Sequence, residues 1–223
     1  MTADEVEQAK HYSSEEERFN VASHAVGLFL STIGLFFLLK KAIQHGEMLH
    51  LVSFGIFGIS MMMLYAASTA YHSSRDPALR KKLRILDHAA IFTLIAGTYT
   101  PLTLLTLQGT LGWTIFGITW GIASAGIILK IFFAGRFKLL STLMYVLMGW
   151  LIIFFIKPLA ESFPGAGLYW LIAGGIAYTS GAIIYSIHKI SFNHAVFHLF
   201  VLLGSICHFI AVYCYVLPVA LTQ

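Results

Sequence analysis

The sequence predicts an all-α integral membrane protein, a polytopic bundle of seven transmembrane helices. Hydrophobic residues make up 58% of the 223 residues, charged residues only 11%, and the mean hydropathy is +0.80. These values are far from the balance of a soluble domain of this size. In addition, seven uncharged runs are each long enough to cross about 30 Å of hydrocarbon. Little sequence remains between the runs, so we expect no additional soluble domain.

The predicted spans follow one another at short intervals. They cover about residues 19–39, 48–72, 88–107, 111–129, 139–156, 165–187 and 194–217. Together they form one membrane domain, 19–218, which a short tail, 1–18, precedes. The tail is rich in Asp and Glu and has only Lys10 and Arg18 as basic residues, so it lacks the basic region and cleavage site of a signal peptide. We therefore expect the tail to be retained.

The distribution of basic residues predicts the orientation. Of the 14 Lys and Arg residues, only Lys40, Lys41 and Lys157 fall on one side of the predicted membrane, and the rest fall on the side of the amino terminus. Cytoplasmic loops carry an excess of basic residues, so we expect the amino terminus in the cytoplasm and the carboxyl terminus outside a cell's inner (plasma) membrane. Because these charges are explained as orientation signals in short loops, the formal charge of +4 does not indicate a nucleic-acid partner.

Two motifs inside the spans predict helix shape and packing. GTYTP, Gly97–Pro101, should kink the third span, because proline cannot continue the helical hydrogen bonds. GITWG spaces Gly117 and Gly121 four residues apart, a pattern that permits close approach of a neighbouring helix. Neither motif carries chemistry.

Ionisable residues inside a span are costly and are therefore candidates for function. The stretch NHAVFHLFVLL places His194 and His198 four residues apart at the head of the seventh span, so that both leave one helix face roughly 6 Å apart at Cβ. STAYH ends the second span with the same spacing between Ser68 and His72. The HxxxH pair by itself is equally consistent with two helix-end histidines that face lipid headgroups.

The predicted topology brings these residues to one depth. The second span ends at the cytoplasmic face, and the first, third and seventh spans begin there. His72, His194, His198 and Asp87 of ILDH should therefore all lie in the inner leaflet. Three neutral imidazoles around an open fourth position are the ligand set of a catalytic zinc site. The sequence thus predicts Zn²⁺ on the three histidines near the cytoplasmic face, with Asp87 and Ser68 close by.

Further polar residues gather at the head of the first span. ERFNVASH contains Glu17, Asn20 and His24, which we expect to hydrogen-bond the metal ligands from behind or to brace the first span. His208, in the middle of the seventh span, is expected to be a packing residue.

These motifs, in this order, resemble the bacterial hemolysin III branch of the PAQR (progestin and adipoQ receptor) family: ERFNVASH, STAYH followed by a basic loop and LDH, GTYTP, and NHAVFH. The resemblance covers nearly the whole chain. It implies seven transmembrane helices with a cytoplasmic amino terminus and a zinc ion near the cytoplasmic side. It also implies that the metal ligands fall on His72, His194 and His198, with Asp87 and Ser68 placed around the metal-bound water.

The wider group that contains this family includes alkaline ceramidases, so the resemblance implies zinc-dependent hydrolysis of a membrane lipid amide or ester in membrane lipid homeostasis. In that interpretation Asp87 is the general acid and base, and Ser68 orients the water or donates to the oxyanion. The substrate would be a membrane lipid that enters sideways from the bilayer.

Three other classes of function remain open. A non-catalytic, receptor-like sensor stabilised by zinc would need the same ligands, so the sequence does not separate it from the hydrolase. A transporter is disfavoured, because its ionisable groups should lie near the middle of the membrane with access from both sides. A cytolytic pore is disfavoured as well, since no span shows a regular polar stripe.

Overall fold

The computed structural model describes residues 12–133, 138–187 and 189–217, and these residues form helices and no strand. Most are α-helices; η1 and η3 are π-helical and η2 is a 3₁₀-helix. In chain order the elements are α2 (Ser14–His45), α3 (Met48–Ser73), α4 (Pro77–Pro101), η1 (Leu102–Leu107), α5 (Gly109–Phe132), α6 (Lys138–Gly149), η2 (Leu151–Phe155), α7 (Ile156–Ser162), α8 (Gly165–Ser186), α9 (Asn193–Ala211) and η3 (Val212–Val216).

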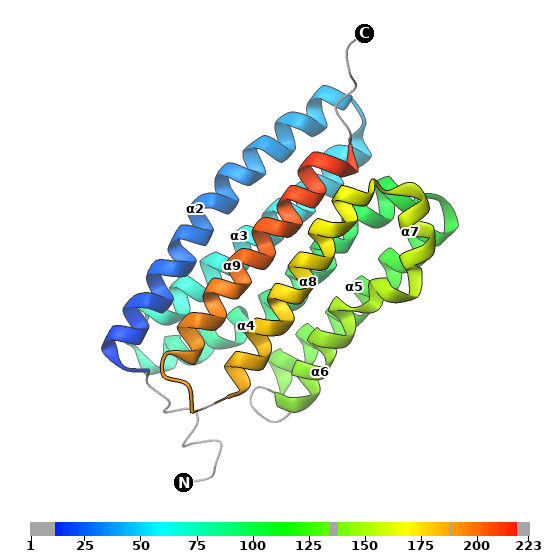
Figure 1. Cartoon of the computed structure of the whole chain (residues 1–223). Coiled ribbons are helices and arrows are strands. Elements are labelled where there is room, and N and C mark those ends of the chain that lie inside the picture. The colour runs from blue at the N-terminus through cyan, green and yellow to red at the C-terminus, as the bar shows by residue number, and fades with distance from the viewer. Residues whose placement is uncertain (1–11, 134–137, 188, 218–223) are drawn as a thin grey trace.

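Seven helical stretches of the described chain are long and apolar enough to cross a membrane, which confirms the predicted fold class. They run up and down in alternation (Figure 1). Their bounds are Ser14–His45, Met48–Ser73, Pro77–Leu107, Gly109–Phe132, Leu140–Ser162, Gly165–Ser186 and Asn193–Val216.

The first helix begins before the apolar run does. The hydroxyl of Ser13 accepts a hydrogen bond from the backbone N–H of Glu16 at 3.1 Å, and acidic residues fill the first turn of α2. Both features favour a helix start at this point, because they satisfy unpaired N–H groups and complement the helix dipole. Of the predicted tail, 1–18, residues 1–11 lie outside the described residues, and residues 14–18 belong to α2.

The third span is longer than its apolar sequence. Asp76 accepts a hydrogen bond from the backbone N–H of Leu79 at 2.6 Å, and Pro77 stands in the first turn, so α4 starts at residue 77 and includes the basic sequence after it. At the other end α4 stops at Pro101, and the chain continues as the π-helix η1. The proline thus changes the type of helix at the point where a kink was expected.

The fifth span is broken. After Gly149 the α-helix gives way to η2 and then to α7, and the span ends at Ser162. The hydroxyl of Tyr99 in α4 donates to the carbonyl oxygen of Gly149 at 3.2 Å and accepts from the N–H of Ile152 at 2.8 Å. One buried side chain therefore satisfies two backbone groups at the break, as the interior of a membrane requires.

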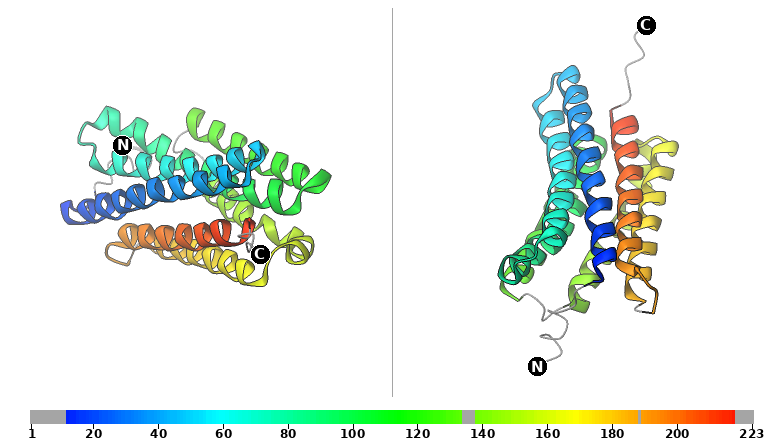
Figure 2. Two further views of the ribbon diagram at one scale, coloured as in Figure 1. Left: turned by 90° about the horizontal axis from the view of Figure 1, so that it is seen from above. Right: turned by 90° about the vertical axis from the view of Figure 1, so that its left-hand side faces the viewer.

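Neighbouring helices follow the order α8, α9, α2, α3, α4 and α5, and α6 packs against α4 and α5 (Figure 2). The third and second spans are the most buried of the seven. Helices α2, α4, α6 and α9 begin at one end of the bundle, where α3, α5 and α8 finish (Figure 1). We call this the basic end, because Arg75, Arg80, Lys81, Lys82 and Arg84 lie there, between α3 and the first turns of α4.

Hydrogen bonds and close contacts fasten the middle of the bundle. The hydroxyl of Tyr65 in α3 donates to Ser205 in α9 at 2.7 Å, and Tyr178 in α8 bonds the same serine at 2.8 Å. Gly27 in α2 packs directly against the fully buried ring of Tyr65. The glycines of GITWG behave differently, because no described atom of another helix lies within 4 Å of a Cβ placed on Gly117 or Gly121. Among the described residues, no neighbouring helix makes the close approach that this motif permits.

These two environments predict opposite effects of the same substitution. Gly27→Leu should lower the free energy of unfolding by about 1–3 kcal/mol, because the new side chain must displace the Tyr65 ring. Gly117→Leu is the matched control and should leave the melting temperature of the detergent-solubilised protein unchanged or slightly raised. Equal melting temperatures for the two variants would contradict the packing of α2 on α3.

Candidate metal centre

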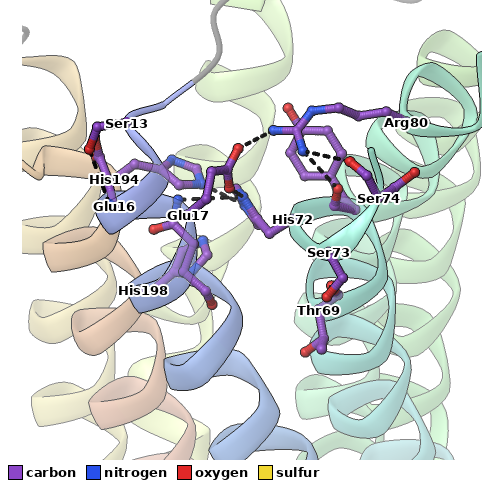
Figure 3. A network of polar contacts seen from close by, with 12 residues as sticks. Ser13, Glu16, Glu17, Thr69, His72, Ser73, Ser74, Arg80, His194 and His198 are labelled. Carbon is purple, nitrogen blue, oxygen red and sulfur yellow. Dashed lines mark hydrogen bonds and ion pairs between the residues drawn. The ribbon is translucent and has the colours of Figure 1, made fainter. Parts of the chain in front are cut away.

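Three buried histidines meet at the basic end of the bundle (Figure 3). His72 comes from the last turn of α3, and His194 and His198 come from the first two turns of α9. Their exposed fractions are only 4%, 7% and 2%. One ring nitrogen from each lies within 4.8 Å of the other two, and the Nε2 atoms of His72 and His194 are 3.0 Å apart. The structure thus brings together the histidines that the sequence places at one depth.

The carboxylate of Glu17 orients His72. Its Oε2 lies 2.6 Å from Nδ1 of His72, whereas the side-chain nitrogen of Asn20 lies 3.4 Å from the same atom. The shorter contact assigns the proton to Nδ1, which donates to the carboxylate. Nε2 of His72 then carries a lone pair that points at the other two rings. A carboxylate behind a histidine in this way is the usual support of a metal ligand.

His198 is oriented in the same sense by oxygen atoms of α2. Its Nδ1 lies 3.3 Å from the carbonyl oxygen of Asn20 and 3.3 Å from the hydroxyl of Ser23. The Ser23 hydroxyl itself donates to that carbonyl at 3.1 Å, which leaves the His198 N–H as a donor to both oxygens. As with His72, the Nε2 atom is left as the acceptor that is able to bind a metal ion.

The donor set fits a small divalent metal ion. Zinc binds imidazole nitrogen at about 2.0–2.1 Å, so two nitrogens of one tetrahedral site stand roughly 3.3 Å apart. The separation of 3.0 Å between His72 and His194 is close to this value. Lone pairs of buried nitrogens at such distances repel one another unless a proton or a cation lies between them. Three histidines placed this close together can therefore hold a metal ion.

Arg80 completes the support of the cluster, although its place in the sequence marks it only as an orientation signal. Its guanidinium bonds the second oxygen of Glu17 and donates to the carbonyl oxygens of Tyr71 and Ser74, each at 3.2 Å. It also lies over the ring of Tyr71 at 4.5 Å. Arg80 thus closes the end of α3 and holds the carboxylate that orients His72. No local motif distinguishes it from the other basic residues of its loop.

Asp87 and Ser68 lie beside the cluster, as the sequence places them. Both are buried, with exposed fractions of 8% and 1%. The carboxylate of Asp87 interacts with His72 and with Ser68, while the Ser68 hydroxyl makes no hydrogen bond of good geometry to a described residue. A carboxylate and a hydroxyl that interact with each other therefore stand next to the candidate metal ligands.

His24 lies behind His198. The two rings are stacked with centroids 3.6 Å apart and planes 15° from parallel, and the His24 ring also meets Tyr65 edge-on. Neither ring nitrogen of His24 has a hydrogen-bond partner among the described residues. Among the residues expected behind the ligands, Glu17 and Asn20 therefore hydrogen-bond them directly, and His24 supports His198 by stacking.

Tyr12 covers the cluster at the basic end, and no sequence motif predicts this role for Tyr12. Its ring stacks on His194 at 4.6 Å and lies 5.9 Å from the ring of His72. Burial and the neighbouring Tyr185 raise the pKa of the Tyr12 hydroxyl, so this group stays neutral. A tyrosine just before the first span carries no recognisable signal in a sequence, because its position over the histidines depends on how α2 meets α9.

Comparison with known proteins gives consistent matches along the chain. The family model described as Haemolysin-III related matches residues 12–209. Hemolysin-3 of Bacillus cereus is 50% identical over 206 residues, which are 92% of this chain and 94% of that protein. The Hemolysin-3 homolog of Bacillus subtilis (strain 168) is 47% identical over 209 residues, 93% and 98% of the two chains. The human monocyte to macrophage differentiation factor is 26% identical over 193 residues, 80% of each chain.

The contacts of Glu17 predict a measurable contribution to stability. Glu17→Ala should lower the free energy of unfolding by about 1–3 kcal/mol, because the His72 N–H and the Arg80 guanidinium both lose their acceptor. Glu15→Ala, in the same helical turn but exposed, should change it by much less.

A double-mutant cycle measures the pairing itself. Glu17→Ala combined with Arg80→Ala should destabilise the protein by less than the sum of the two single changes, since both remove one contact. Thermal unfolding in detergent would provide the values. Additive losses would show that the two side chains do not interact.

Proposed function

Because this chain belongs to the haemolysin-III related family, we propose that it binds zinc and hydrolyses an amide or ester bond of a membrane lipid, in membrane lipid homeostasis. The observation that carries this proposal is the group of three buried imidazoles, with one ring nitrogen of each within 4.8 Å of the other two, beside the carboxylate of Asp87 and the hydroxyl of Ser68. A buried carboxylate and a buried hydroxyl beside the ligands are not needed to hold a structural metal ion.

The ligands of the ion would be His72, His194 and His198. A bound zinc ion supplies a Lewis acid that polarises a carbonyl group and activates water near neutral pH. Glu17 and the carbonyl of Asn20 hold two of the imidazoles in the tautomer that presents Nε2. Their hydrogen bonds also fix the directions of these two rings, so the donors need no rearrangement to meet a metal ion.

Asp87 and Ser68 would carry out the proton transfer and the charge stabilisation. Asp87 takes a proton from the attacking water and returns it to the leaving nitrogen or oxygen, as general base and then general acid. Ser68 donates its O–H to the oxygen of the scissile carbonyl as negative charge develops there. Asp87 interacts with His72 and with Ser68, so the two groups would act on the same side of a carbonyl held at the three histidines.

The arrangement of the charges supports a cytoplasmic location for the basic end. The positive-inside rule places this end in the cytoplasm of the cell that carries the protein in its inner membrane. The candidate metal centre then lies at the depth of the inner leaflet, within one membrane domain, 19–218. A lipid of that leaflet would be the substrate.

A second function is favoured by how completely the site is covered. Tyr12 stacks on His194, and all three histidines are buried, with exposed fractions of 7% or less. A closed site of this kind suits a receptor-like sensor in which zinc ties α3 to α9 without catalysis. The two functions differ in whether a lipid product forms.

The test measures zinc content and lipid turnover together. Purified wild type should contain about one zinc ion per chain and release fatty acid from one class of a panel of ceramides and phospholipids. His198→Ala should lose both. His208→Ala is the matched control and should retain zinc, because this half-buried histidine bonds the carbonyl of Leu171 away from the cluster.

Asp87→Asn separates the two functions. It should retain zinc and lose at least 100-fold in turnover, since the proton transfer is removed while the ligands stay. Zinc in wild type without any product would favour the sensor. Absence of zinc from wild type would overturn both functions.

The position of Tyr12 over His194 predicts that this ring slows the dissociation of zinc. Tyr12→Ala should increase the rate of zinc transfer to a soluble chelator, because the ring that covers His194 is removed. Tyr169→Ala, at a position 75% exposed, is the control and should leave that rate unchanged. Equal rates for Tyr12→Ala and wild type would show that the metal exchanges by another route.

A further inference from the structure

A second feature of the basic end lies on the lipid-facing side of α4. A cavity of about 290 Å³ runs between α3, α4 and α5. Its walls are apolar. The small, buried residues Ala89 and Ala90 of α4 form its floor. The rim is exposed: Met63, Leu86 and Ile131 have exposed fractions of 43%, 48% and 53%. The groove therefore opens to the acyl chains of the bilayer.

One charged residue, Lys82, lies at the outer end of the groove. Lys82 is exposed and lines the cavity together with the apolar residues. Along α4 the lining residues Lys82, Leu86, Ala89 and Thr93 recur at intervals of three and four, which places them on one helix face. A cation thus stands at the mouth of an apolar groove, and the groove continues from it toward the middle of the membrane.

The groove is long enough for the headgroup end of an acyl chain. Lys82 and Thr93 are eleven positions apart, which at 1.5 Å per residue is about 16 Å. Lys82 precedes the apolar run of the third span, whereas Thr93 lies within it. A lipid in this groove would therefore place its phosphate at Lys82 and the first part of one acyl chain along α4.

Other charges at this end favour an anion. Lys81 and Arg75 are exposed on the same loop and helix start. The nearby carboxylate of Asp76 caps α4 through Leu79, and that of Glu17 is held by Arg80 and His72. The field at the mouth of the groove is therefore positive. Basic pockets between transmembrane helices on the cytoplasmic side are a known way of binding anionic lipid headgroups.

We propose that this groove is a binding site for an anionic glycerophospholipid of the leaflet at the basic end, with one acyl chain along α4 and its phosphate on Lys82. The site is separate from the candidate metal centre. Asp87 leaves α4 roughly 100° around the helix from Leu86 and interacts with His72 instead. The lipid in the groove is therefore a bound partner and not the substrate of the proposed hydrolase.

The test is a lipid titration of the full-length protein in detergent, with bound lipids counted by native mass spectrometry. Phosphatidylglycerol should bind with one high-affinity molecule per chain, and phosphatidylcholine with the same acyl chains should not. Lys82→Gln should weaken the binding roughly fivefold, the value of one basic residue near a membrane surface. Lys82→Arg should restore it.

Three controls make the result specific. Lys81→Gln removes a neighbouring exposed charge that does not line the groove, and should leave the affinity unchanged. Ala89→Phe fills the floor and should abolish binding although Lys82 remains. Glycerol 3-phosphate, which has the anion without the chains, should not compete.

Equal binding of the two lipids, or equal losses for Lys81→Gln and Lys82→Gln, would overturn the proposal. Asp87→Asn should bind phosphatidylglycerol as wild type does, whether or not the protein hydrolyses lipids. Failure of the groove and failure of the metal centre are therefore distinguishable.

Discussion

The carboxylate of Glu17 is the group on which the rest of the basic end depends. It accepts hydrogen bonds from His72 of α3 and from Arg80 of α4 while it is part of α2. A charge this close to the hydrocarbon is tolerated only when it is paired, and here one carboxylate pairs with two partners on two other helices. The direction of the His72 ring follows from this contact, and the same carboxylate holds the Arg80 guanidinium that bonds the last carbonyls of α3 (Figure 3).

The same contact determines which ring nitrogen His72 offers to a metal ion. With its proton directed to Glu17, the His72 imidazole offers a lone pair to His194 and His198, and the carbonyl of Asn20 has the same effect on His198. The first span thus contributes no ligand to the candidate metal centre but determines the tautomer of two of them. Its role is that of a support, which is why its polar residues gather in the first turns of α2.

Helix α4 presents two different chemistries on two faces. Toward the inside it carries Asp87 beside His72, and toward the lipid it carries a groove that begins at Lys82. Both faces belong to the helical start that Asp76 and Pro77 create ahead of the apolar run. The basic sequence after residue 77 is therefore more than an orientation signal, because in helical form Arg80 turns toward the cluster and Lys82 toward the bilayer.

The sequence by itself determined the fold class, the number of spans and the group of His72, Asp87, His194 and His198 at one end. Hydropathy, the count of basic residues and the four-residue spacing of His194 and His198 are local properties of the sequence, so they can be evaluated without a structure. Tertiary structure decided what no local pattern contains: that Arg80 pairs with Glu17, that Tyr12 covers His194, that Gly117 faces lipid while Gly27 meets Tyr65, and that the fifth span breaks where Tyr99 satisfies its backbone. The physical reason is that each of these depends on which side of one helix faces another, and apolar residues of a membrane span look alike whether they face a helix or the bilayer.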